Sequence, residues 1–222
     1  MSEAVARRLT GLAALVAAVA LVVQVPLYFI YPGPPPDGNV LSRLLVGIVA
    51  LASLVVFVTA FRDLVRRAGP SHEWAGSIAF STGLVYATVT LVSMGLEAGA
   101  VIAVDRPIDP TIDVSGTYLL YGTVSRLMLA LFLASLGYAV SRTRLLPRWT
   151  GRSAYVLAGT NLAFVPSLFF GNDPAFFYAA NGWGTTALMG AVFSYWLLAL
   201  GVATYRSAGR VGRAAGSPAL RH

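Results

Sequence analysis

Residues 81–104 read STGLVYATVTLVSMGLEAGAVIAV, a long apolar run that contains a single carboxylate, that of Glu97. About 20 consecutive apolar residues suffice for a helix to cross the hydrocarbon core of a bilayer. A charged side chain inside that core is costly unless it meets a partner or water. The stretch therefore predicts a transmembrane helix whose Glu97 side is turned toward other helices or toward a cavity.

The composition of the whole chain is typical of a membrane protein. Of its 222 residues, 57% are hydrophobic and 11% are charged, whereas a soluble domain carries about 25% charged residues. Cys and Lys are absent, and the two His lie outside the apolar runs. Disulfides, thiolate metal sites and lysine Schiff bases are therefore excluded, and we expect neither a metal nor a cofactor.

Six apolar segments follow one another along the chain, separated by turns rich in Pro and Gly. We expect an all-α fold, a bundle of six transmembrane helices that forms a single membrane domain over residues 1–205. Residues 206–222 are predicted to form a flexible basic tail near anionic lipid headgroups. The expected spans are 10–30, 40–61, 74–104, 117–140, 153–171 and 182–205.

The distribution of charge predicts how the bundle is oriented. The net charge is +7, and all but three of the arginines lie before the first span, in alternate connections or after the last span. The other connections carry mainly Asp. By the positive-inside rule, both termini are cytoplasmic. We expect a multi-pass protein of the inner (cytoplasmic) membrane of a bacterium, since an Arg-only, Ala- and Gly-rich chain favours a bacterial source. The tail lacks the aromatic residues of a nucleic-acid site, so we expect no nucleic-acid partner.

Polar residues form a stripe along the third span and meet a second charge in the fourth. Thr82, Tyr86, Thr90, Ser93 and Glu97 are three or four residues apart, which places them on one helix face. At 1.5 Å per residue, Glu97 lies about 12 Å below the outer end of its span and Arg126 about 13 Å below that of the fourth. Equal depth predicts a Glu97–Arg126 ion pair.

Further polar residues are expected at the same level of the bundle. We predict a polar binding pocket that opens outward in the outer half of the membrane. The alternative is a purely structural set of interhelical hydrogen bonds with one salt bridge. The predicted pocket residues are Glu97, Arg126, Arg43, Asn161, Gln24 and Tyr86.

Three classes of function are compatible with such a pocket. The leading hypothesis is a protein that binds or carries a small amphipathic molecule or lipid. A membrane-embedded isomerase or cyclase would use Glu97 as acid/base and Arg126 to set its pKa. A structural or accessory subunit would use the polar groups for packing alone. Membrane lipids are expected partners.

Two weaker patterns lie near the end of the chain. Small residues recur in the last span about every four positions, which suits close packing within the chain or in a homo-oligomer. The connection FFGNDPAFFYAANGWG, residues 169–184, is rich in aromatic residues. It is interpreted either as an interfacial belt or as a lid over the pocket.

The stretch LGYAVSRTRLLPRWTGRSAYVLAGTNLAF, residues 136–164, carries a basic turn followed by a Leu-Pro-Arg-Trp-x-Gly step into the next span. In this it resembles the DUF4386-type family of uncharacterised bacterial integral membrane proteins. The resemblance covers about a fifth of the chain. It implies a multi-span helical bundle, and it carries no activity that could be transferred to these residues.

Overall fold

The computed structural model describes residues 3–216 and contains helices but no strands over that part of the chain. Six helices are long and apolar enough to cross a membrane, which confirms the predicted all-α class and the six predicted spans. Short helical turns extend several of them, among them the π-helical turns η2 (Leu120–Val124) and η4 (Gly184–Leu188). The long helices are α1 (Glu3–Leu27), α2 (Asp37–Ala68), α3 (Glu73–Ala103), α6 (Ser125–Thr143), α7 (Arg148–Ala163) and α8 (Met189–Gly216).

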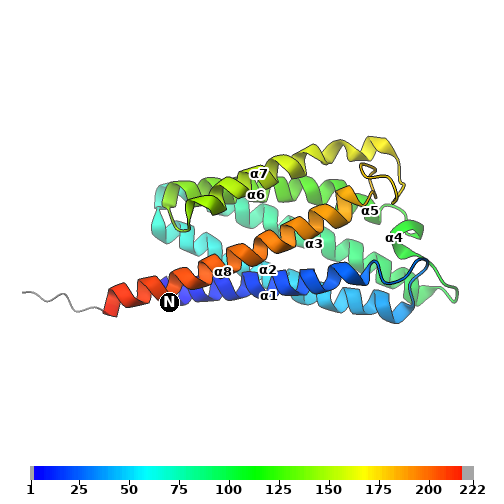
Figure 1. The fold of residues 1–222 in the computed structure, drawn as a ribbon, viewed down its shortest axis with the longest axis horizontal. Coiled ribbons are helices and arrows are strands. Elements are labelled where there is room, and N and C mark those ends of the chain that lie inside the picture. The colour runs from blue at the N-terminus through cyan, green and yellow to red at the C-terminus, as the bar shows by residue number, and fades with distance from the viewer. Residues whose placement is uncertain (1–2, 217–222) are drawn as a thin grey trace, which may run out of the picture.

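The six long helices run side by side in one elongated bundle (Figure 1), and their contacts arrange them as an open ring. Each helix packs against the next one in the chain as far as α7, and α8 returns to pack along α1. By contrast, α7 and α8 make few contacts with each other. The ring thus continues from α1 to α8, and the break in it, which we call the seam, lies between α7 and α8.

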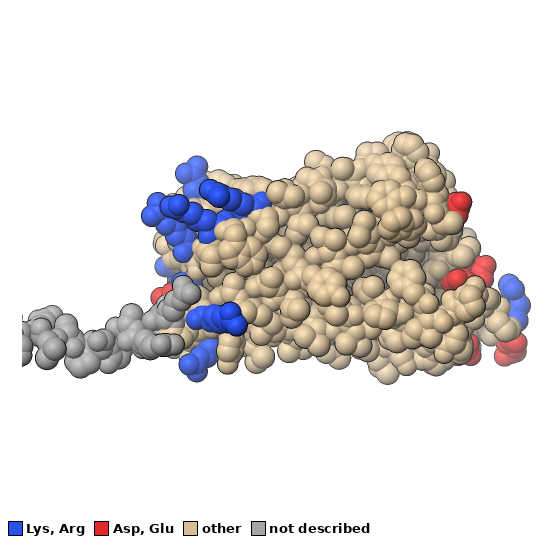
Figure 2. All heavy atoms as spheres, viewed as in Figure 1, with Lys and Arg blue, Asp and Glu red and all other residues tan. Residues whose placement is uncertain are grey.

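Charge separates the two ends of this ring (Figure 2). Most arginines gather at the end where α1 begins and α8 ends, which we call the arginine end. The opposite end, which we call the acidic end, shows most of the acidic side chains in this view. The connections at that end and the start of α2 contain Asp37, Asp105, Asp109, Asp113 and Asp173, together with Arg106. The surface between the ends is free of charge in this view, as the hydrocarbon core requires.

The predicted tail partly belongs to a helix. Since α8 continues to Gly216, residues 206–216 extend the last span rather than leaving it. Residues 217–222 of the predicted tail lie outside the described residues.

Helices α1 and α8 approach most closely toward the arginine end. A Cβ atom added to Gly11 would lie 2.6 Å from the backbone nitrogen of Tyr205, and one added to Gly201 would lie 3.0 Å from Leu15. Such spacing requires small residues at the contact. From there the two helices diverge toward the acidic end (Figure 1), and the space that opens between them contains the candidate site.

Candidate functional site

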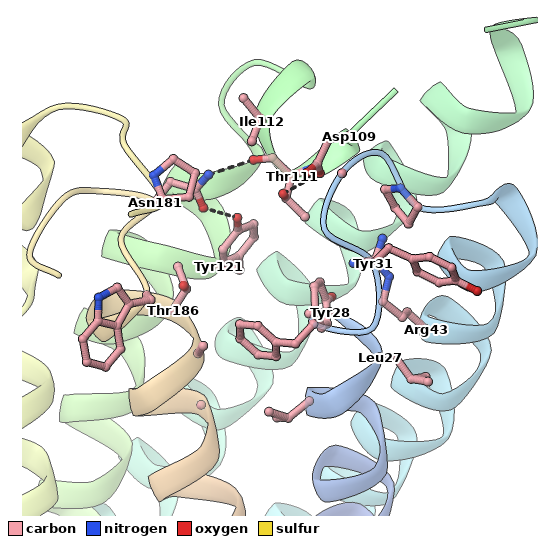
Figure 3. A pocket seen from close by; sticks show the side chains of 18 residues that line it. Leu27, Tyr28, Tyr31, Arg43, Asp109, Thr111, Ile112, Tyr121, Asn181 and Thr186 are labelled. Carbon is pink, nitrogen blue, oxygen red and sulfur yellow. Dashed lines mark hydrogen bonds between the residues drawn. The ribbon is translucent and has the colours of Figure 1, made fainter. Parts of the chain in front are cut away.

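A cavity of about 280 Å³ lies between α1 and α8 at the acidic end, and we call it the outer cavity. Figure 3 shows Tyr28 and Arg43 on the α1–α2 side, Thr186 on the α8 side, and Tyr121 and Asn181 above them. Its walls also include Leu27, Ile112 and Trp183. The lining is therefore largely apolar, with a few polar groups, as in sites for small organic molecules.

The roof of the outer cavity is held by a chain of hydrogen bonds through Asn181. The Tyr121 hydroxyl donates to Asn181 Oδ1 at 2.6 Å, and Asn181 Nδ2 donates to the Thr111 carbonyl at 2.9 Å. Asn181 thereby joins the 171–183 connection to η2 and to the short helix α4 (Pro110–Asp113). Gly122 allows the close approach, because a Cβ there would lie 2.9 Å from the Ala180 carbonyl oxygen.

Beneath the outer cavity lies a second, smaller one of about 110 Å³, which we call the inner cavity. The two share Val25, Tyr28, Tyr121 and Gly190 in their walls, so they adjoin. Gln24, Tyr86, Thr90, Glu97, Arg126 and Ser194 line the inner one. Buried polar residues of the third and fourth spans thus lie in the inner cavity, below the outer one.

Arg43 is buried at the outer cavity without a hydrogen-bond partner. It is 3% exposed, and within the described structure its Nε and Nη2 atoms donate to no acceptor. Its guanidinium carbon lies 4.2 Å from the centre of the Tyr28 ring, a cation–π contact. Burial raises the pKa of the Tyr28 hydroxyl above its usual range, so Tyr28 stays neutral beside this cation.

Arg126 is bound within the bundle by groups other than Glu97. Its Nη1 donates to Asn161 Oδ1 at 3.2 Å, and its Nη2 approaches the Tyr121 carbonyl at 3.4 Å. No ion pair between Arg126 and Glu97 exists among the described residues. The predicted pairing was wrong because equal depth does not make two side chains point toward each other.

Glu97 is 3% exposed, and in the part of the chain that is described its carboxylate has neither a hydrogen bond nor an ion pair within 4.0 Å. The opposite charge that acts on it is that of Arg43. Its neighbours in the stripe differ from it. Thr90 contacts the Ser125 hydroxyl at 3.3 Å, and Ser93 donates to the Thr117 carbonyl at 3.0 Å. Glu97, unlike Thr90 and Ser93, makes no hydrogen bond to another helix among the described residues.

The predicted site residues fall into three places. Glu97, Arg126, Gln24 and Tyr86 line the inner cavity, and Arg43 lines the outer one. Asn161 lines neither, and instead fixes the Arg126 side chain. Gln24 also donates to the Arg43 carbonyl at 3.0 Å, which links α1 to α2 beside the site.

Sequence reasoning did not assign Tyr28, Asn181 and Trp183 to the pocket. Tyr28 follows Gln24 by four residues, so its place on the same helix face was a usable signal. Asn181 and Trp183 come from a connection whose path no periodicity predicts. That connection does contribute to the walls of the outer cavity, as the lid interpretation expected.

Asp109, in the connection at the acidic end, also reaches the wall of the outer cavity. Its Oδ1 accepts from the Thr111 backbone at 3.1 Å and from the Thr111 hydroxyl at 2.7 Å. It is therefore the N-cap of α4, with Pro110 in the first turn. This carboxylate supports the loop geometry.

Comparison of the chain with family models, with curated proteins and with solved structures finds no match. The resemblance of residues 136–164 to DUF4386-type proteins stays a prediction.

Proposed function

We propose that the protein binds a small amphipathic molecule in the outer cavity, from the side of the membrane that the acidic end faces. The observation that carries the proposal is a pair of buried, oppositely charged side chains that have no hydrogen-bond partner among the described residues, Arg43 at the outer cavity and Glu97 at the adjoining inner cavity. A buried charge without a partner is costly. A site of this kind is stabilised when a ligand supplies the missing contacts.

The closed lower end of the site favours binding over free passage. The inner cavity ends where α1 and α8 converge, and the glycine contacts at Gly11 and Gly201 leave no space between the helices there. An open channel would need a continuous polar path at this level. A carrier would need α8 to separate from α1, with which it packs over much of its length.

Charge supports an orientation with the acidic end outside the cell. Arginine-rich connections remain on the cytoplasmic side of membrane proteins, and the arginines gather at one end of the bundle. We thus place the protein in the cytoplasmic membrane as a multi-pass protein that binds its ligand from outside the cell.

The two alternatives have less support. An accessory subunit would use its polar groups for packing, as Arg126 and Ser93 do, but Arg43 and Glu97 have no such contact. A second free carboxylate near Glu97 would support acid/base catalysis. Asp109 is the candidate nearest the cavity, and it is engaged as a helix cap.

The test compares ligand retention by two glycine variants. Gly190 lies in the wall of both cavities, and a Cβ added there meets no atom within 4 Å. Gly190→Leu should therefore fill the cavity without a clash. Gly99→Leu is the matched control, because Gly99 has the same free space but faces outward from α3. Both substitutions favour the helix by up to about 1 kcal/mol.

Native mass spectrometry in mild detergent would record what each protein retains. We expect a defined small-molecule adduct on the wild type and on Gly99→Leu, and its loss from Gly190→Leu. An adduct that survives Gly190→Leu would place the ligand elsewhere. A wild type that retains nothing from a total membrane extract would argue for the structural alternative.

A further inference from the structure

We propose that the ligand is an amphiphile with a single negative charge, and that its anionic group binds the guanidinium of Arg43. This inference rests on the proposed function, because it specifies the ligand of the same cavity. It follows from the balance of buried charge, from the geometry around Arg43 and from the size of the cavity.

The buried side chains at the site carry more positive than negative charge. Arg43, Arg126 and Glu97 are each less than 5% exposed, so two guanidinium groups are accompanied by one carboxylate at this depth. Asp109 lies higher, is only partly buried and accepts two hydrogen bonds from Thr111. One further negative charge would neutralise the buried set, which lowers the cost of its burial.

Of the two guanidinium groups, that of Arg43 is free to bind. Arg126 already donates to Asn161 and to the Tyr121 carbonyl. Arg43 has no acceptor in the described structure and lies at the wall of the outer cavity. A guanidinium offers several N–H donors in one plane, which match the two oxygens of a carboxylate or the oxygens of a phosphate. The Tyr28 ring lies 4.2 Å from the guanidinium carbon, and this cation–π contact uses none of the N–H donors.

The volume of the outer cavity limits the size of the apolar part of the ligand. At about 280 Å³, the outer cavity lies at the lower end of the range for small-molecule pockets, roughly 300–1,000 Å³. Leu27, Ile112 and Trp183 provide apolar surface for this part of the ligand. The cavity therefore suits a short single-chain acid, whereas a whole diacyl lipid would leave its chains outside.

The probe for the test is 8-bromooctanoate, with 8-bromooctan-1-ol as its neutral counterpart. Bromine quenches the fluorescence of a tryptophan that it touches, and Trp183 is the tryptophan in the wall of the outer cavity. Quenching is titrated on the full chain in dodecyl maltoside. The Trp183→Phe variant identifies the part of the signal that comes from this site.

We expect Trp183-dependent quenching by the acid at a concentration at least about tenfold lower than by the alcohol, as a charge-assisted hydrogen bond implies. Arg43→Gln should remove this difference, and Arg43→Lys should keep part of it, which also shows that the fold survives a change at this position. Arg62→Gln is the control, because Arg62 is an exposed arginine of the same helix at the arginine end. It should leave the difference unchanged.

Two results would overturn different claims. Equal Trp183-dependent quenching by acid and alcohol would refute the anionic ligand and leave the proposed binding function standing. Absence of any Trp183-dependent quenching by either probe would refute the binding function as well. Displacement of the acid by phosphatidylglycerol and not by phosphatidylcholine would assign the anion to a lipid headgroup; insensitivity to both lipids would assign it to a free amphiphile.

Discussion

The Tyr28 ring covers the Arg43 guanidinium at 4.2 Å, so the residue that follows α1 shields a charge near the start of α2. The charge of Arg43 acts on Glu97 of α3, and the two side chains do not form an ion pair within 4.0 Å in the described structure. Because the two opposite charges interact without a direct contact, each can still bind a third group. This relationship separates a binding site from a structural salt bridge, and the predictions below depend on it.

Asn161 is predicted to stabilise the protein through Arg126. Its side chain accepts from Arg126 and donates to the Leu157 carbonyl, so Asn161→Ala should leave a buried guanidinium poorly satisfied. We expect a loss of about 1–3 kcal/mol in the free energy of unfolding. Thr160→Ala, on the exposed side of the same helix, should change it little. Thermal unfolding in detergent measures both, and equal effects would refute the assigned role.

Double-mutant cycles should show that Glu97 is coupled more strongly to Arg43 than to Arg126. The first pair interact through charge in the structure, whereas Arg126 is bound by Asn161. The variants are Glu97→Gln combined with Arg43→Gln or with Arg126→Gln, and the coupling energy is read from their unfolding free energies. A larger coupling for the Arg126 pair would restore the ion pair that the sequence suggested.

The contact of α1 with α8 should tolerate no side chain at Gly11. A Cβ there would lie within 2.8 Å of the Tyr205 backbone, so Gly11→Leu must push the helices apart. We expect destabilisation of about 1–3 kcal/mol or more, the usual cost of overpacking. Gly159→Leu serves as the control, because a Cβ at Gly159 meets nothing within 4 Å. If both variants unfold at the same temperature, the helices do not close the site as described.

The absence of cysteine allows a direct test of orientation. Asp173→Cys should react in intact cells with a maleimide that cannot cross membranes, because Asp173 lies at the acidic end. Ser71→Cys, an exposed position in the α2–α3 connection at the arginine end, should react only after the cells are permeabilised. The reverse pattern would place the cavity mouth in the cytoplasm.

The fold was predictable because membrane spans are set by the length of apolar runs, and all six expected runs correspond to helices. The arrangement of the side chains in the site was less predictable. Counting residues along a helix gives the depth of Glu97 and of Arg126 but leaves open how each helix is rotated about its axis. It also leaves open which helices are neighbours. The sequence alone therefore could not tell which arginine acts on Glu97. Asn181 illustrates a second limit, because its connection returns over the cavity through tertiary hydrogen bonds.

The most direct test of the account is the position of a bound ligand. A crystal grown with 8-bromooctanoate, measured at the bromine absorption edge, would show the bromine as an anomalous peak. The account predicts a peak inside the outer cavity, among Leu27, Ile112 and Trp183, with density for the carboxylate at Arg43. An empty outer cavity, with bromine only on the lipid-facing surface of the helices, would contradict it.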